Sequence, residues 1–445
     1  MKITIMSDLH FGFAQGTERE HDVYEAASEA MEKALASDLI LITGDIFDMR
    51  VPSTEILARA MEIFTKPILS KSAVELVEVI NKNRDEISPK SLLGTPVIAI
   101  YGTHERRVKG LMNPVQALEK AGFLICLHCN GIIFEKKKVL HTDIGVPQGS
   151  KGEKVCVQGM SGVPDQYTES VLKEWNPKPI PGCTNILMIH QSVKEFMHER
   201  VPHTISLEYL PKGFDLYILG HIHRPEKSSY DNSPVIIPGS LVPTQLTKES
   251  TKSKGFWFFE TESRELKFIP LQTQRTIYFI EKENIEEIKK ELEKLLSGKF
   301  AKKPIIRITG RISNETEKDI RNRFGDRAII SFKKEHSAEE ETPRKTLEEH
   351  KLSVQELGKK LLEQNIKEFK LDPKIFEQVF ELLLEGKQDD ALDILSKEFK
   401  TSPARERTEL QTRVQKESQA KTTQLKPRHS EPMTKKEAKG LERFL

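Results

Sequence analysis

Hydrophobic and polar positions alternate in two ways along the first 260 residues. Short apolar runs typical of strands occur at KITIMS, DLILIT, PVIAIY, NILMIH and FDLYIL, and SPVIIPGS and GFWFFE continue the series. Between the early runs, apolar residues recur at helical spacing, which predicts helices over 18–36, 53–64 and 72–83. Such alternation predicts an α/β domain, and the strand-rich later part predicts a sandwich of two sheets.

A smaller unit follows this first domain, which we place at 1–270. RTIYFIE, PIIRITGRI and AIISFK predict three strands, and the spacing over 285–296 predicts a helix between the first two. Residues 271–333 are therefore predicted to form a small α+β capping domain. The stretch 334–351 is charged and poor in hydrophobic residues, which is typical of a linker.

The last part of the chain divides into a helical segment at 352–400 and a polar tail at 401–445. Ser353 and Glu356 form a capping box, and Ile375 begins an apolar helical face. So short a segment buries too little surface to be stable alone, so we expect it to bind another protein, with an ordinary core helix as the alternative. The tail has 11 Lys and Arg against 6 Asp and Glu; we expect it to be disordered, and either to bind DNA or to be merely solvated.

Composition sets limits on the class of protein. A chain of 445 residues is expected to have two or three domains. Its 69 Lys and Arg against 67 Asp and Glu give a net charge of +2, so any nucleic-acid binding must rest on local features. Four cysteines do not make a disulfide framework. No apolar run approaches the ~18 residues needed to span a bilayer, and Asp8 and His10 interrupt any signal peptide, so we expect a cytoplasmic protein without membrane contact.

Residues of the metal-binding types follow five of the strand-like runs. They are Asp8 and His10, then Asp45 and Asp48, then Thr103, His104 and Glu105, then His190, and finally His221 and His223. One Asp-x-His or His-x-His pair is common by chance, but five motifs in this order are not. Because residues that follow successive strands can converge at one edge of a sheet, we expect a two-metal site for hydrolysis of a phosphate ester.

The residue types also suggest roles within this site. Asp45 suits the bridge between two cations, because a carboxylate has two oxygens and a full negative charge. Asp8 and His10 can point to one metal if the strand breaks near Gly12, and His221 and His223 can serve different metals. Mixed nitrogen and oxygen ligands favour Mn²⁺ or Fe²⁺ over Mg²⁺. His104 can protonate the leaving oxygen or stabilise the charge on the phosphorane.

The five motifs together resemble those of the calcineurin-like metallophosphoesterase superfamily. Within it, the segments SDLHFGF, MIHQ, LGHIH and PGSL resemble the Mre-eleven/SbcD family of DNA double-strand-break repair nucleases. The resemblance is close over residues 1–260 and holds in outline over 271–333. It implies a four-layer α/β/β/α sandwich with a small capping domain and a C-terminal helical segment.

The resemblance also implies site residues, cofactors and partners. One Mn²⁺ would be held by Asp8, His10, Asp45 and His223, and a second by Asp45, Thr103, His190 and His221. His104 would be the catalytic histidine of a 3′→5′ exonuclease on duplex ends and an endonuclease on single strands. Residues 352–399 would bind a Rad-fifty-type ATPase, and helices over 53–64 and 114–120 would form a homodimer.

One departure from the family pattern keeps other functions open. The family's metal-binding Asn is Thr103 here, so we expect a weaker second metal or one that relies on a water. A DNA-repair scaffold with impaired catalysis is therefore one alternative, and a phosphoesterase for another substrate is a second. Arg106, Arg107 and Lys109 are candidate DNA contacts, with a solvated loop as the alternative, and Asp48 joins them because its ligand role is not fixed.

Overall fold

The computed structural model describes residues 1–107, 111–136, 152–197, 204–282, 284–310 and 312–334, together with the positions 378, 379 and 394. Residues Met1–Glu335 form one compact unit. The predicted linker at 334–351, helical segment at 352–400 and tail at 401–445 lie almost entirely outside the described residues. Those domain boundaries therefore stay predictions.

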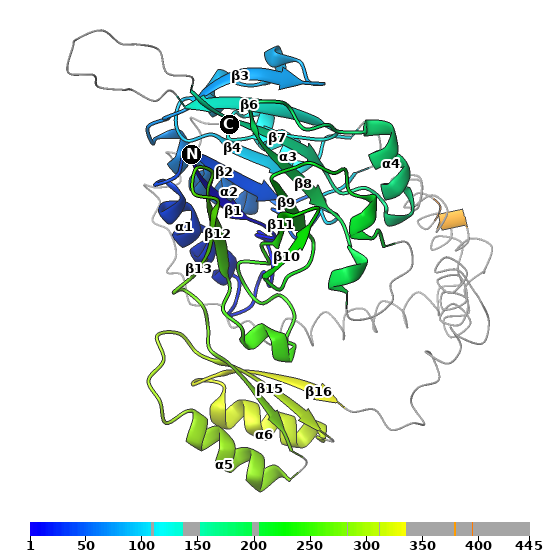
Figure 1. The fold of residues 1–445 in the computed structure, drawn as a ribbon. Helices are drawn as coiled ribbons and strands as arrows, with labels where there is room; N and C mark the ends of the chain where they lie inside the picture. The colour runs from blue at the N-terminus through cyan, green and yellow to red at the C-terminus, as the bar shows by residue number, and fades with distance from the viewer. Residues whose placement is uncertain are drawn as a thin grey trace, which may run out of the picture. The chain divides into compact units, whose positions relative to one another are not determined.

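Two large sheets form the framework of the described chain up to residue 270 (Figure 1). The first sheet has, within the described residues, the strand order β13 (Glu265–Pro270), β12 (Gly255–Glu260), β1 (Lys2–Met6), β2 (Leu39–Thr43), β4 (Val97–Ile100) and β5 (Ile125–Cys126). The second has the order β10 (Glu226–Tyr230), β11 (Ser233–Ile237), β9 (Leu216–Gly220), β8 (Thr184–His190), β7 (Glu153–Met160), β6 (Asn130–Lys136) and β3 (Glu75–Ile80). Strands β1, β2 and β4 are parallel neighbours, as are β7, β8 and β9, so their carboxyl ends share an edge.

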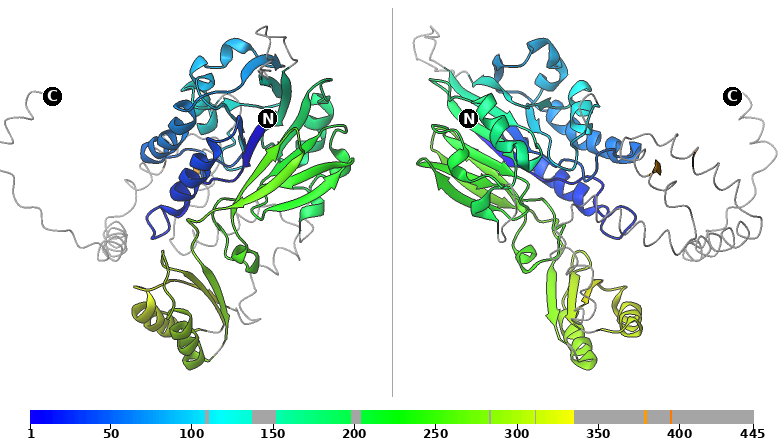
Figure 2. Two further views of the ribbon diagram at one scale, coloured as in Figure 1. Left: turned by 60° about the vertical axis from the view of Figure 1, so that its left-hand side comes forward. Right: turned by 90° about the vertical axis from the view of Figure 1, so that its right-hand side faces the viewer.

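Alternating side chains bury both faces of each sheet. Ile3 and Ile5 of β1 lie in the core between the two sheets, whereas Met6 lies in the core on the outer face of the first. Helices α1 (Asp22–Ala34), α2 (Thr54–Ile68) and α3 (Pro114–Lys120) cover that outer face, and α4 (Thr168–Trp175) packs on the outer face of the second sheet. In Figure 2 the blue helices and the green strands lie on opposite sides. The predicted four-layer α/β/β/α sandwich is confirmed.

The element boundaries differ from the predictions in two places. The helix predicted over 72–83 is wrong: the segment forms β3, an edge strand that pairs antiparallel with β6. Its β-branched residues Val77, Val79 and Ile80 suit a strand. The helix predicted over 53–64 is confirmed and longer than expected, since α2 runs to Ile68 after Ser53, whose hydroxyl accepts the Ile56 N–H at 3.4 Å.

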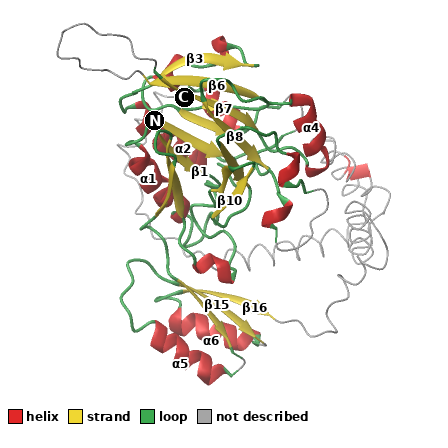
Figure 3. Ribbon diagram, viewed as in Figure 1, coloured by secondary structure: helices red, strands yellow, loops and turns green. Residues whose placement is uncertain are grey.

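The predicted capping domain forms a small third sheet with two helices of its own. Strands β14 (Ile277–Glu281), β15 (Ile305–Gly310) and β16 (Ile329–Lys334) are parallel, and α5 (Ile285–Leu295) and α6 (Asn314–Phe324) form the crossovers. Both helices lie on one face of this sheet (Figure 3). A core around Ile280, Ile288 and Phe324 holds them there. Across the whole described part of the chain, the structure contains no helix that is both long and apolar enough to cross a membrane.

Candidate metal centre

The chain leaves β1 and β2 in two loops that remain hydrogen-bonded beyond the strands. The Asp8 N–H donates to the Gly44 carbonyl, and the His10 N–H to the Asp45 carbonyl, both at 3.0 Å. Asp8, His10 and Asp45 have φ of 52°, 50° and 46°, and His221 has φ of 86°. A left-handed conformation costs a residue other than glycine about 1–3 kcal/mol, and such strain is concentrated at functional sites. The backbone is therefore bent at the residues that turn their side chains into the centre.

The first group of donor atoms belongs to Asp8, His10 and His223. Their ligand atoms lie within 4.8 Å of one another. The Nε2 atoms of His10 and His223 are 3.1 Å apart, and His223 Nε2 is 3.5 Å from Asp8 Oδ1. Two nitrogens that bind one ion at right angles, each about 2.1 Å away, would be about 3 Å apart. The spacing therefore fits a shared cation.

The second group belongs to Asp45, His190 and His221, again within 4.8 Å. His190 Nε2 is 3.2 Å from Asp45 Oδ2, and the opposite ring N–H of His190 donates to the Thr43 carbonyl at 2.7 Å. That hydrogen bond fixes the ring and leaves Nε2 as the donor toward a metal. The residues thus sort as expected, because His221 and His223 join different groups.

Several buried donor atoms of both groups lack a hydrogen-bond partner among the described residues. They are Asp8 Oδ1, His190 Nε2 and His221 Nδ1. A buried polar atom without a partner costs about 1–3 kcal/mol, which a bound cation would offset. One carboxylate and two imidazoles in each group are ligands that suit Mn²⁺ and Fe²⁺ better than Mg²⁺. The residues present therefore fit divalent metals.

The electrostatics of the centre favour positive charge. Burial raises the pKa of Asp45, but the charge of His190 outweighs it and holds that pKa well below its usual range. Burial lowers the pKa of His190, but Asp45 and Asp8 raise it to about 9. Burial and then the charge of His190 lower the pKa of His221 to about 4, which keeps this imidazole neutral at pH 7. The carboxylates of Asp8 and Asp45 therefore stay ionised although they are buried.

Asp45 connects the two groups. It belongs to the second, where it contacts His190, and the charge of His10 from the first contributes to its low pKa. Its Oδ1 also accepts the backbone N–H of His104 at 3.0 Å. A Cβ atom at Gly102 would overlap the Asp45 carboxylate, so the close approach of the two loops requires glycine there.

His104 lies at the rim of the centre. Its side chain is 43% exposed, and its ring stands edge-on to that of His10 with centroids 4.9 Å apart. His104 Nδ1 is 3.1 Å from the Asp48 carbonyl oxygen and 3.6 Å from Asp48 Oδ1. The same Asp48 Oδ1 is 2.9 Å from His10 Nδ1. Asp48 therefore belongs to the centre, where it contacts both histidines.

The family follows from a match over this region. Residues 1–225 match the model of the calcineurin-like phosphoesterases. The chain belongs to this family. Its members use divalent metal ions, in agreement with the two donor groups.

Relatives within the calcineurin-like phosphoesterases extend the resemblance beyond residue 225. The double-strand break repair protein Mre11 (Mre-eleven) of Methanopyrus kandleri is 24% identical over 359 residues, which are 77% of this chain and 72% of that protein. Mre11 of Arabidopsis thaliana is 26% identical over 63% of this chain and 43% of its own length. Mre11 of Saccharolobus solfataricus is 27% identical over 54% of each chain. The chain thus spans about half of the latter two relatives, and the predicted resemblance to this family is confirmed.

In this calcineurin-like phosphoesterase, the structure places one of the remaining sequence candidates beside the second donor group. Thr103 places its hydroxyl 3.5 Å from Asp45 Oδ2, the carboxylate oxygen that also faces His190. Arg106 and Arg107 are half-buried in the segment that follows. Lys109 lies outside the described residues. The structure therefore brings Thr103 to the second group.

Sequence reasoning assigned no role to Glu105, although it is fully buried beside the centre. Its two carboxylate oxygens accept the N–H groups of Phe47 and Gly102, each at 2.7 Å. Burial, and next the charge of Asp45, raise the pKa of Glu105 to about 8. Glu105 therefore ties the loop after β2 to the loop after β4. The only signal for it in the sequence was its place directly after His104.

Proposed function

We propose that this chain is a Mn²⁺-dependent DNA nuclease that processes DNA ends in double-strand-break repair. Its activities would be 3′→5′ exonuclease on duplex ends and endonuclease on single strands. The observation that carries this proposal is the pair of donor groups connected by Asp45, with His104 exposed at their rim. The similarity to Mre11 proteins supports DNA as the substrate.

Two Mn²⁺ ions per chain would be held by the two donor groups. Asp8, His10 and His223 would bind the first, and His190 and His221 the second. Asp45 would contact both, since it connects the groups. Thr103 is 3.5 Å from the Asp45 carboxylate, so its hydroxyl would orient a water at the second ion.

The cations would supply charge stabilisation to the phosphodiester and lower the pKa of the attacking water. The chain's own contribution is to hold His104 and its proton. The Asp48 carbonyl, 3.1 Å from His104 Nδ1, favours the tautomer with the proton on Nδ1 and leaves Nε2 for the substrate side. When the ring is doubly protonated, Nε2–H can donate to the leaving oxygen. The carboxylate of Asp48 also faces the ring, with Oδ1 3.6 Å from His104 Nδ1.

The test compares cleavage of end-labelled duplex DNA with Mn²⁺ binding. His104→Ala should lower the cleavage rate by about 10²–10⁴-fold, the usual contribution of a general acid. Calorimetry should show nearly unchanged Mn²⁺ affinity, because His104 is not expected to bind the metal. The matched control is His21→Ala, since His21 is another exposed histidine, 60% accessible and directly before α1. Equal cleavage by parent and His104→Ala would remove His104 from the mechanism.

We also propose two partners. Residues 352–399 would bind the coiled coil of a Rad-fifty-type ATPase, and α2 with α3 would form a homodimer. Large apolar side chains are exposed at the ends of these helices: Leu69 is 79% exposed, Leu111 51% and Met112 54%. Exposed apolar groups of this kind often mark an interface. Light scattering at micromolar concentration should give the mass of two chains, and the mass of one would contradict the dimer.

A DNA-repair scaffold with impaired catalysis is the second candidate, and Thr103 is the observation that favours it. A hydroxyl is a poorer ligand than the amide oxygen of asparagine, so the second ion would bind weakly. A scaffold would bind DNA ends and the ATPase but show no cleavage at any Mn²⁺ concentration. A phosphoesterase for another substrate would instead hydrolyse small phosphodiesters and leave duplex DNA intact.

A further inference from the structure

Thr244 holds the ring of His223, the least buried member of the first donor group. The side chain of His223 is 25% exposed, whereas those of Asp8 and His10 are at most 1% exposed. His223 Nδ1 lies 2.6 Å from the Thr244 hydroxyl. This contact sets the rotation of the ring and leaves Nε2 facing Asp8 and His10.

The loop 239–244 that carries Thr244 is itself attached to the backbone of His223. The Ser240 N–H donates to the His223 carbonyl at 3.1 Å. The buried ammonium of Lys254 donates to the same carbonyl at 2.5 Å and to the Ser240 hydroxyl at 3.1 Å. The backbone of Lys254 also bonds the segment 271–275, through the Leu271 N–H at 2.9 Å and the Gln274 side chain at 3.0 Å. That segment joins β13 to β14 of the capping domain.

A second connection runs from the same segment to Thr244 through buried charges. Both carboxylate oxygens of Asp22 accept from Arg275 Nε, at 2.8 and 2.9 Å, and Asp22 also pairs with Arg19 Nε at 3.4 Å. Arg19 Nη2 donates to the carbonyl of Pro243 at 2.6 Å, directly before Thr244. Arg275 Nη1 donates to the carbonyl of Lys303, in the capping domain, at 3.0 Å.

These side chains are nearly buried, so the cluster resists rearrangement. Arg19, Asp22 and Arg275 are 11%, 7% and 12% exposed. Removing the charge of Asp22 would leave two guanidinium groups close together without their shared carboxylate, which is costly away from water. The Arg19 side chain would then lose its fixed position against the Pro243 carbonyl.

We propose that Asp22 is a positioning residue for the metal centre, which holds Arg19 against the loop 239–244 and thereby sets where Thr244 places His223. The capping-domain junction at 271–275 is attached to the same carboxylate. The affinity of the first donor group for Mn²⁺ therefore depends on a residue of α1 that touches none of the donors. This inference rests on the proposed function in taking His223 as a metal ligand.

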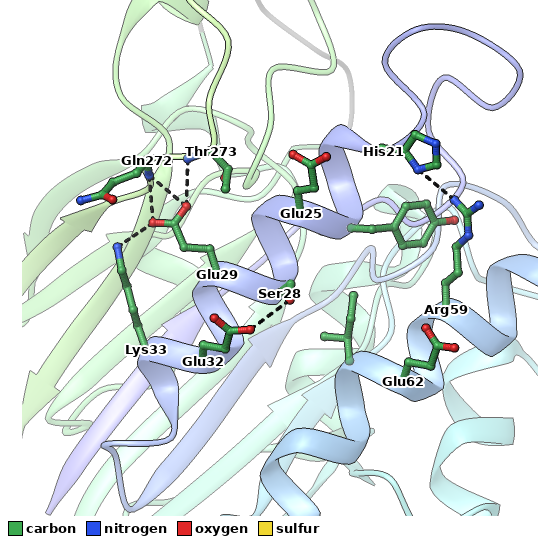
Figure 4. Close-up of a pocket in the computed structure, with 12 residues that line it drawn as sticks. His21, Glu25, Ser28, Glu29, Glu32, Lys33, Arg59, Glu62, Gln272 and Thr273 are labelled. Atoms are coloured by element: carbon green, nitrogen blue, oxygen red, sulfur yellow. Dashed lines mark hydrogen bonds and ion pairs between the residues drawn. The ribbon is translucent and has the colours of Figure 1, made fainter. Parts of the chain in front are cut away.

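Glu29 offers a matched control, because it anchors the same segment without reaching the loop. Its carboxylate accepts the N–H of Gln272 at 2.9 Å and that of Thr273 at 2.9 Å, and it pairs with Lys33 at 2.6 Å. Figure 4 shows Glu29 on α1 pointing toward these two residues. Glu29→Gln loosens the junction but leaves Arg19 and Pro243 in place.

The test is calorimetry of Mn²⁺ binding to the metal-free full chain, with no DNA present. Asp22→Asn should weaken one of the two binding events by about 10–100-fold, the usual effect of a group that orients a ligand. The other event, and both events in Glu29→Gln, should match the parent. Arg19→Lys keeps the positive charge but cannot form the forked hydrogen bonds of a guanidinium group, so it should weaken the same binding event. This variant tests the inference even if Asp22→Asn does not fold.

Thr244 supplies the readout that a general loss of stability would not give. Thr244→Val should weaken the same event, and Thr244→Ser should restore it because the hydroxyl is kept. If Asp22 acts through Thr244, adding Asp22→Asn to Thr244→Val should cause no further loss. The inference would be overturned if both Asp22→Asn and Arg19→Lys bound Mn²⁺ like the parent. It would also be overturned if the double variant lost Mn²⁺ affinity by the product of the two single-variant losses. A parent chain that binds no Mn²⁺ would overturn the proposed function, and the inference with it.

Discussion

Gly102→Ala should disable the metal centre with one added methyl group. The φ of Gly102 is not in the left-handed region, so the effect comes from space alone. A Cβ atom at this position would lie 2.5 Å from the Asp45 backbone nitrogen and 2.6 Å from Asp45 Cγ. The Asp45 Oδ1 atom would be closer still, and because ordinary contact begins near 3.4 Å, the Asp45 carboxylate must move by about 1 Å or more.

That displacement acts on catalysis more than on folding. Overpacking of this kind typically costs about 1–3 kcal/mol of unfolding free energy. A misplacement near 1 Å at a reacting centre can cost about 10²-fold in rate. Because Asp45 connects the donor groups, we expect both Mn²⁺ events to weaken and cleavage of duplex DNA to fall about 100-fold.

The assay pairs cleavage of end-labelled duplex with Mn²⁺ calorimetry and thermal unfolding. Gly298→Ala is the control, because a Cβ there meets nothing closer than 3.6 Å and the residue is exposed. This control should match the parent in all three measurements. Parent-like cleavage and Mn²⁺ affinity in Gly102→Ala would refute the place given to Asp45.

Three further predictions concern the second metal, the C-terminal segment and alkaline stability. Thr103→Asn should tighten the weaker Mn²⁺ event and lower the Mn²⁺ concentration needed for cleavage; unchanged values of both would show that residue 103 does not act on the metal. Deleting 345–445 should leave Mn²⁺-dependent cleavage but abolish co-purification with the ATPase, and retained co-purification would place the interface elsewhere. Burial raises the pKa of Tyr217 to about 12, so the folded state keeps a proton that the unfolded state loses above pH 10. Stability should therefore fall from pH 10 to pH 12, and chemical denaturation of Tyr217→Phe should show a shallower fall, whereas an equal slope would contradict this.

The sequence identified the centre because its chemistry is local and its order is regular. The donors lie at the carboxyl ends of parallel strands: the pairing of β1 with β2 brings Asp8 and Asp45 together, and His190 reaches them from the end of β8 in the second sheet. The spacing of His221 and His223 allowed them to serve different metals, and the family resemblance implied which donors each would join.

The features that could not be predicted from the sequence are those that depend on contacts between distant residues. The apolar spacing at 72–83 fits a helix as well as a strand, and pairing with β6 decided for β3. Left-handed backbone at Asp8 and His10 could not be read from the sequence, because Asp and His adopt it more often than most residues but still only in a minority of positions. Thr244 and Lys254 contact His223 across 21 and 31 positions, and Asp22 is connected to it through Arg19 and Pro243, which are 224 positions apart. No local pattern joins these residues, so their roles became visible only in the structure.

Anomalous diffraction from crystals grown with Mn²⁺ tests the central claim most directly. The account predicts two manganese peaks about 4 Å apart in each chain, the usual spacing of a two-metal site. One peak should contact Asp8, His10 and His223, the other His190 and His221, with the Asp45 carboxylate touching both. A single peak, or two peaks that do not share Asp45, would contradict the two-metal centre.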